Sequence, residues 1–154
     1  MGLDMYLYKK SWVNSGEWIK PEAREEIKMT RGGNDVDTSN IRYIVEEVGY
    51  WRKANAIHKW FVNNVQKGED DCGEYVVTYE RLMELKELCE RVLALLQAGE
   101  YNLAAAELPT QSGFFFGNTE YGMDYEDDLV RTISILNRLT EEDVRHTLTY
   151  TSSW

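Results

Sequence analysis

The sequence predicts an α+β fold in which about three main helices pack with a few short, antiparallel strands in a single domain, residues 1–154. Apolar residues recur at helical spacing in separate stretches, and alternating chemistry marks short strands before and between them. The chain has 154 residues, of which 43% are hydrophobic and 12% aromatic. That length and composition support a hydrophobic core and exclude a disordered chain.

The first predicted strand covers residues 3–8, where the chemistry alternates and Leu3, Met5 and Leu7 fall on one face. Further along, Pro21 is suited to the first position of a short helix, because that position needs no backbone N–H.

A glycine-containing loop is predicted at residues 31–35. Residues 41–45 are rich in β-forming side chains and favour a strand, although a helix fits them nearly as well. The first main helix is predicted from about residue 49 to residue 66, with Gly68 as a left-handed cap. Its core-facing residues follow helical spacing and are Ala54, Ile57, Phe61 and Val65.

The second main helix follows a short predicted strand at residues 74–77 and begins after Thr78, a residue type that caps helix N-termini. Gly99 is predicted to end this helix. Its core-facing stripe consists of apolar residues at helical spacing, namely Leu82, Leu85, Cys89, Val92, Leu93 and Leu96.

Residues 101–107 are predicted as a further helical turn, and a third main helix is predicted from about residue 124 to residue 139. Acidic side chains crowd the first turn of this helix, where the helix dipole favours negative charge. Thr140 has the pattern of a cap for one last short helix. From residue 147 the chain is predicted to be a loose tail, since termini are poorly ordered unless they dock.

The formal net charge of −10 excludes a general nucleic-acid-binding protein, because duplex binders use basic surfaces to displace counterions. A small anion in a locally basic pocket, or a basic protein surface, remains compatible with this charge. The sequence has neither a signal peptide nor a run of about 18 apolar residues, so we expect a cytoplasmic protein without membrane contact. Cys72 and Cys89 have no metal-binding spacing and are expected to be reduced thiols.

We expect no cofactor and no metal site. The acidic runs at residues 69–71 and 124–128 lack the ligand spacing of a calcium loop. Solvation explains the first run, and the helix start explains the second.

The first candidate site is the predicted helix around residues 49–61, which mixes aromatic, cationic and amide side chains. Side chains spaced three and four residues apart lie within reach of one ligand. We assign stacking to the indole, phosphate binding to the cations, and orienting hydrogen bonds to the imidazole and amide. The alternative is that the indole is a core residue and the cations a solvated face. The candidates are Trp51, Arg52, Lys53, Asn55, His58 and Lys59.

The second candidate site is the segment 108–121, in which Gly113 and Gly117 bracket three phenylalanines. Glycines allow close backbone approach to a ligand, and the hydroxyl and amide side chains add hydrogen-bond donors and acceptors. Three adjacent phenylalanines cannot all point into one pocket, so we expect a structural strand over residues 114–116 with functional residues on either side of it. The candidate ligand-binding residues are Thr110, Gln111, Ser112, Thr119 and Tyr121, the last as a second stacking ring.

Residues 1–7, 50–65 and 108–121 together carry a resemblance to a known family. The strongest family mark is the sequence at residues 51–61, Trp-Arg-Lys-Ala-Asn-Ala-Ile-His-Lys-Trp-Phe, which is long and specific. On these segments the chain resembles a family of small accessory proteins encoded by bacteriophages and prophages. Some compact phage proteins of similar size sequester cyclic nucleotide signals of bacterial immunity. That analogy implies an anti-defence sponge in the cytoplasm of an infected or lysogenic bacterium.

We therefore expect a non-enzymatic phage accessory protein that binds a small anionic, nucleotide-like ligand, such as a cyclic nucleotide. The alternative hypothesis is an acidic protein-interaction inhibitor of a host factor. Its binding would depend more on acidic side chains than on Trp51, namely on Asp70, Asp71, Asp127 and Asp128.

A third hypothesis is a small nucleotide hydrolase that uses His58 with Glu120 or Asp124 as its acid–base pair. Ten Tyr and five Trp are a surplus of aromatic residues for a chain this short. That surplus favours an apolar interface between copies, and hence a homo-oligomer.

Overall fold

The structure is a computed structural model and describes residues 2–154. Its main sheet has four strands in the order β4–β1–β6–β5, and every neighbouring pair is antiparallel. The strands are β1 Asp4–Trp12, β4 Tyr43–Arg52, β5 Tyr75–Val76 and β6 Thr147–Ser153. The predicted α+β fold with antiparallel strands is therefore confirmed, although β1 and β4, with nine and ten residues, are long strands.

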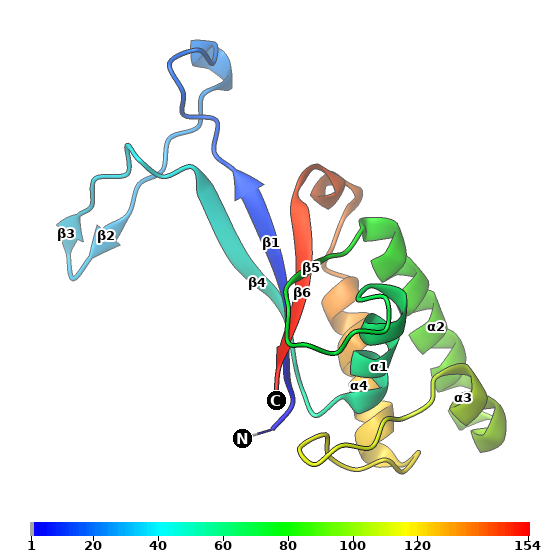
Figure 1. Cartoon of the computed structure of the whole chain (residues 1–154). Helices are drawn as coiled ribbons and strands as arrows, with labels where there is room; N and C mark the ends of the chain where they lie inside the picture. Colours follow the sequence, from blue (N-terminus) through cyan, green and yellow to red (C-terminus); the bar gives the residue numbers. More distant parts are fainter. Residues whose placement is uncertain (1) are drawn as a thin grey trace.

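The helices α1, α2 and α4 lie together on one side of this sheet, with α3 beside α2 (Figure 1). Among residues 2–154, none of the helices has the length and apolar character needed to cross a membrane. The α-helices are α1 Asn55–Asn64, α2 Tyr79–Gln97, α3 Tyr101–Glu107 and α4 Met123–Leu136, and the 3₁₀ helices are η1 Pro21–Ala23 and η2 Glu141–Arg145.

The hydrophobic core fills the space between the helices and the sheet. The predicted inward face of β1 is confirmed, since Leu3, Met5 and Leu7 are completely buried. Thr78 accepts a hydrogen bond from the backbone N–H of Arg81 and caps α2 as expected. Within α2, the predicted stripe is buried at Leu82, Leu85, Cys89, Val92 and Leu96, whereas Leu93 is only partly buried.

An arm formed by residues 13–42 projects from the far ends of β1 and β4 (Figure 1). It contains η1 and a small hairpin of β2 Thr30–Arg31 and β3 Asn34–Asp35. The loop expected at residues 31–35 is the turn of this hairpin, where Gly32 and Gly33 adopt φ values of 58° and 82°. Val13 is the only buried residue of the arm, so the arm has no core of its own.

The predicted helix at residues 49–66 begins later than expected, because Gly49 to Arg52 belong to β4. Gly49 pairs with Leu7, and Trp51 pairs with Met5. A Cβ atom at residue 49 would lie 2.7 Å from a methyl carbon of Ile135, so glycine permits this close packing. The helix prediction was wrong here because strand pairing with distant residues outweighs local spacing.

The prediction of a loose tail from residue 147 is also wrong, because these residues form β6 between β1 and β5. Leu148, Tyr150 and Ser152 alternate toward the core and are buried. The expected cap at Thr140 is present as a capping box with Asp143. The tail is ordered because two neighbouring strands take up its backbone hydrogen bonds.

Deletion of residues 147–154 is expected to abolish cooperative folding, because β1 and β5 would lose the strand between them. Far-UV circular dichroism during thermal unfolding measures this. Deletion of Trp154 alone is the control, and we expect it to cost about 1 kcal/mol through one lost hydrogen bond. A truncated chain that still unfolds cooperatively at an unchanged temperature would contradict the central position of β6.

Candidate functional site

The turn between β4 and α1 places two cations at one end of the sheet. Arg52 is the last residue of β4, and Lys53 adopts a left-handed conformation with φ of 60°. The backbone N–H of Lys53 donates to the carbonyl oxygen of Leu3 at 2.7 Å, which fixes the turn against the start of β1. The arginine and the lysine are therefore neighbours where the sheet ends, and the Arg52 guanidinium lies 3.5 Å from a carboxylate oxygen of Asp4.

Asn55, the first residue of α1, anchors the segment that follows α3. Its amide nitrogen donates to the carbonyl oxygens of Phe116 at 3.0 Å and Asn118 at 2.8 Å. Its side-chain oxygen accepts from the backbone N–H of Gln111 at 3.0 Å. Because the amide is buried and bonded at both ends, Asn55 orients the protein's own loop and does not read a ligand directly.

Further contacts tie residues 109–122 to α1 and α4. The Lys59 ammonium donates to the carbonyl oxygen of Thr110 at 3.3 Å. The Tyr121 hydroxyl accepts from the backbone N–H of Thr110 at 3.1 Å, and the Tyr121 ring packs edge-on against Tyr125. Lys59 and Tyr121 therefore hold the loop, and the stacking role expected for Tyr121 has no support in these contacts.

The segment 109–122 contains no helix or strand, so the expected strand at residues 114–116 is wrong. Phe116 alone of the three phenylalanines is buried, whereas Phe114 is 94% exposed. A long, irregular segment that is nevertheless held by specific hydrogen bonds is typical of binding loops.

A pocket of about 300 Å³ lies between the start of α1, this loop and the first turns of α4. The two segments expected to form one composite site therefore do share a pocket. Four predicted candidates line it, namely Arg52, Lys53, Asn55 and Thr110.

Residues outside the predicted ligand-binding set line the rest of the pocket, namely Ala56, Gly117, Asn118, Asp124, Tyr125, Asp127 and Asp128. The sequence predicts the carboxylates as part of a helix start, and nothing in it indicates that they share a pocket with Arg52 and Lys53. Among residues 2–154, no group of three His, Cys, Asp or Glu side chains has the arrangement of a metal site.

One carboxyl of the acidic wall, that of Asp128, has a raised pKa. Burial raises the pKa of Asp128 to about 7, and the negative charges of Asp124 and Asp127 raise it further, whereas Arg131 lowers it. A protonated carboxyl donates a hydrogen bond, so this wall can offer both donors and acceptors.

Trp51 does not belong to the site. Its side chain is completely buried, packs edge-on against Phe61, and donates its indole N–H to the Thr132 hydroxyl at 2.9 Å. The expected stacking role is wrong because β4 turns this side chain toward the core. The alternative of a core aromatic residue describes Trp51 correctly.

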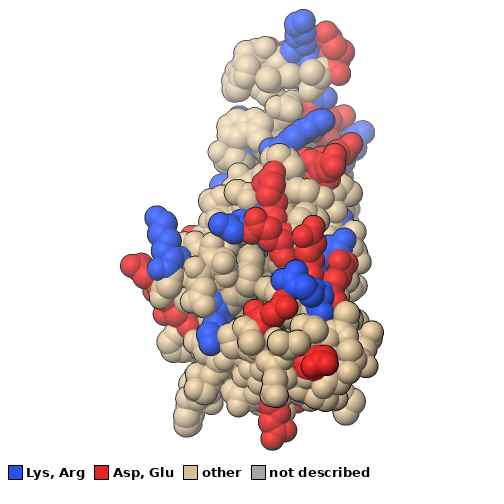
Figure 2. Space-filling model, turned by 90° about the vertical axis from the view of Figure 1, so that its right-hand side faces the viewer, with Lys and Arg blue, Asp and Glu red and all other residues tan. Residues whose placement is uncertain are grey.

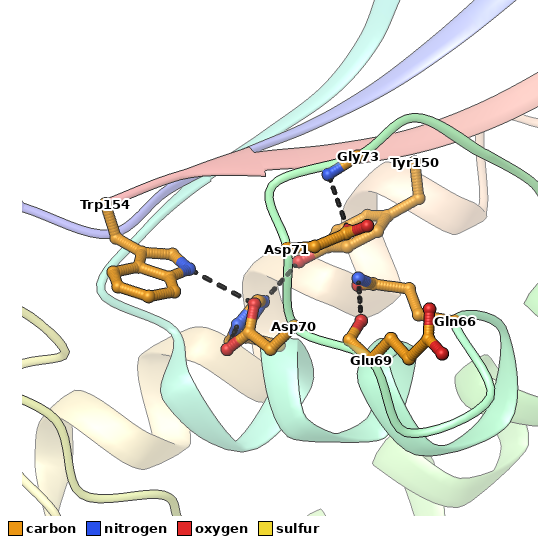
Figure 3. Close-up of polar contacts among 8 residues, drawn as sticks. Gln66, Glu69, Asp70, Asp71, Gly73, Tyr150 and Trp154 are labelled. Carbon is orange, nitrogen blue, oxygen red and sulfur yellow. Dashed lines mark hydrogen bonds and ion pairs between the residues drawn. The ribbon is translucent and has the colours of Figure 1, made fainter.

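His58 is also completely buried, in a chain of polar contacts that links α1, β6 and the turn at residues 69–73. Its Nδ1 lies 2.7 Å from the Tyr150 hydroxyl, and its Nε2 lies 3.0 Å from a carboxylate oxygen of Asp70. The other oxygen of Asp70 accepts from the Trp154 indole N–H at 3.1 Å (Figure 3).

This chain of contacts assigns His58 a structural role. Because a carboxylate only accepts, Nε2 donates to Asp70, and Nδ1 shares a hydrogen bond with the Tyr150 hydroxyl whose direction depends on the tautomer of the ring. Burial raises the pKa of Tyr150 well above its ordinary value, so the hydroxyl keeps its hydrogen. The carboxylate partner is Asp70, so the expected pairing of His58 with Glu120 or Asp124 is wrong.

The other candidates lie on the loop but do not line the pocket. Ser112 and Thr119 are exposed, and the carbonyl oxygen of Thr119 accepts from the Thr110 hydroxyl at 3.0 Å. Gln111 is bonded to Asn55 through its backbone.

The four acidic residues of the inhibitor hypothesis do not act as one surface. Asp70 is bonded to His58, and Asp71 accepts from the backbone N–H of Gly73 and from the Tyr75 hydroxyl. Asp127 and Asp128 instead line the pocket.

Searches of protein-family models, of curated proteins and of solved structures gave no match for this chain.

Replacement of Tyr150 by Phe is expected to lower the free energy of unfolding by about 1–3 kcal/mol, because Nδ1 of His58 would lose its buried partner. The ring would keep its stacking on Phe61. Urea denaturation measures the change. Tyr6→Phe, on the opposite face of the sheet, is the matched control and should have little effect. Equal effects of the two substitutions would argue against a structural role of the hydroxyl.

Replacement of Asp128 by Asn is expected to stabilise the protein above pH 7. The pKa of Asp128 is about 7 in the folded protein and 3.8 ordinarily, so between these pH values the folded state binds more protons than the unfolded state. The wild-type protein therefore loses stability as pH rises from about 4 to about 7, and the uncharged asparagine avoids this loss. We expect the substitution to raise the free energy of unfolding by about 2 kcal/mol above pH 7 and by almost nothing near pH 4. The figure is smaller than the full pKa shift implies, because Asp128 is partly exposed and solvent screens its charge. Urea denaturation across this range tests it, with exposed Glu126→Gln as the control. A gain that does not vary with pH would contradict the burial of this carboxyl.

Proposed function

We propose that this protein binds a small anionic, nucleotide-like ligand in the pocket beside Arg52 and Lys53. The observation that carries the proposal is the loop 109–122, which Asn55 and Lys59 hold in one conformation at the edge of this pocket. A pre-ordered loop favours tight binding because its conformational entropy is lost on folding and not on binding.

The two walls of the pocket have opposite charge, and this supports a ligand with two kinds of polar group. Arg52 and Lys53 are suited to phosphate oxygens, and arginine can bind them through two parallel hydrogen bonds. The carboxylates of Asp124 and Asp127 accept from N–H groups, such as those on the edge of a nucleobase. Phe114, exposed on the same loop, supplies an aromatic face for stacking.

The volume of about 300 Å³ is at the lower end of the range for ligand pockets, about 300–1,000 Å³. One nucleotide unit fits this volume better than a whole dinucleotide. For a cyclic dinucleotide, we propose that one half enters the pocket and the other lies against the exposed loop.

The burial of His58 supports binding without turnover, since the imidazole has no exposed surface to offer a substrate. The resemblance to bacteriophage and prophage accessory proteins supports sequestration of an immune signal in a bacterial host. A sponge of this kind acts through its affinity and abundance.

The acidic protein-interaction inhibitor remains a second candidate, supported by a groove of about 610 Å³ between α2 and η2. The view onto α2 shows acidic side chains gathered across the middle of this face, with basic ones among them (Figure 2). A basic, amphipathic segment of a host protein would fit such a groove, and a pull-down from host lysate measures its capture. The groove is lined by Tyr79, Met83 and Val144, by one cation, Arg145, and by Glu80, Glu84, Glu87 and Glu141.

A panel of linear and cyclic nucleotides is expected to contain a ligand that raises the melting temperature of the protein. A ligand present at 100 times its dissociation constant stabilises the folded state by about 2.7 kcal/mol. Arg52→Gln and Lys53→Asn should abolish the shift, and asparagine tolerates the left-handed backbone of Lys53. Differential scanning fluorimetry followed by calorimetry makes the measurement.

Lys67→Asn is the matched control, because Lys67 is also a left-handed lysine, with φ of 57°, and does not line the pocket. It should keep the nucleotide shift. No shift with any nucleotide, or an equal loss in the control variant, contradicts the proposal.

A further inference from the structure

The protein exposes more surface than a compact chain of its mass. Its accessible surface is 9663 Å², whereas a monomer of 18.0 kDa is expected to expose about 8,000 Å². The excess of about 1,600 Å² is ample for an interface of standard size, which buries about 800 Å² on each partner.

The arm and the adjoining ends of β1 and β4 contribute to this exposed surface. The arm holds a single buried residue, and the strands beside it carry exposed apolar side chains. An arm without a core gains little to offset the entropy of its own ordering, so a partner surface would stabilise it. The exposed apolar residues are Trp12, Trp18, Met29, Tyr43, Ile44 and Val45.

The outer edge of β4 is closed along one half. Arg131 donates from its guanidinium to the carbonyl oxygen of Tyr50 at 2.8 Å, and Arg138 donates to that of Val48 at 3.3 Å. These contacts occupy acceptors that another strand would need. Within residues 2–154, the half from Tyr43 to Glu47 pairs with β1 and has no such cap on its outer edge. This half can therefore accept a further strand.

We propose that a second copy of this chain pairs with this open half, antiparallel and β4 to β4. An antiparallel pair of identical strands is related by a two-fold axis, so the same short edge serves both copies. Centred on the open half, the register places Val45 opposite Val45 and Tyr43 opposite Glu47. The main sheet then continues through the axis as one sheet of both chains.

The antiparallel direction also gives each arm a place to pack. Beyond the paired residues, the arm of one copy runs alongside the capped half of β4 in the other copy. There a groove of about 740 Å³ lies between α4 and β4, and its charged lining consists of Arg52, Arg131 and Arg138 together with Asp127 and Asp128. Residues 22–26 of the arm hold three acidic side chains, Glu22, Glu25 and Glu26, and one cation, Arg24. The run has three negative charges and one positive, and the groove has three positive charges and two negative, so their net charges are opposite in sign.

The test is the molar mass of the purified full chain, measured by size-exclusion chromatography with light scattering over a range of concentrations. The wild type is expected at twice 18.0 kDa. Val45→Lys is expected to lose the dimer, because two ammonium groups would meet across the axis. Ile44→Lys provides a second variant at the same edge. The readout needs no ligand, so it is independent of the proposed nucleotide binding.

Val76→Lys is the matched control, since Val76 is an exposed strand valine on β5, at the opposite edge of the sheet. The exposed fractions of Val45 and Val76 are 59% and 67%, so neither lysine should unfold the chain. The control should remain dimeric. A wild type with the mass of one chain at every concentration, or equal dissociation of Val76→Lys and Val45→Lys, would overturn the proposal.

Discussion

The pairing of β1 with β6 is the contact on which the rest of the structure depends. It joins the beginning of the chain to its end, from Asp4 opposite Ser153 to Lys10 opposite Thr147. The inward side chains of these strands include Leu3, Met5, Leu7 and Tyr150, all completely buried against the helices. Since β4 pairs with β1 and β5 pairs with β6, the four-stranded sheet is complete only when the last residues of the chain have paired with β1.

Two sets of side-chain contacts attach the candidate site to this sheet. Tyr150 of β6 meets His58 of α1, which fixes the helix against the central strand. Three residues before it, Asn55 of the same helix holds the irregular loop 109–122. A single short helix thus carries the loop on rigid structure, which is how binding loops reach a defined geometry without secondary structure of their own.

Residue types that look functional were divided by burial into two groups. Trp51, Asn55 and His58 are buried and make their contacts within the protein, and Trp51 and His58 are completely buried. Arg52 and Lys53 remain exposed because β4 ends at the sheet boundary, although the Arg52 guanidinium also lies 3.5 Å from a carboxylate oxygen of Asp4. Sequence spacing could not separate the groups, since helical periodicity assumed a helix where the chain is a strand.

The sequence by itself determined the α+β class, the first strand, the positions of α2, α3 and α4, and the cap at Thr140. These features follow from local periodicity and capping chemistry. Tertiary structure decided that residues 147–153 form a central strand, that residues 49–52 continue β4, and that Asp128 lines the same pocket as Arg52 and Lys53. Each of these depends on a partner far away in the chain: Leu7 for Gly49, β1 and β5 for β6, and the β4–α1 turn for Asp128. The free energy of pairing and burial between such distant segments leaves no mark on local sequence.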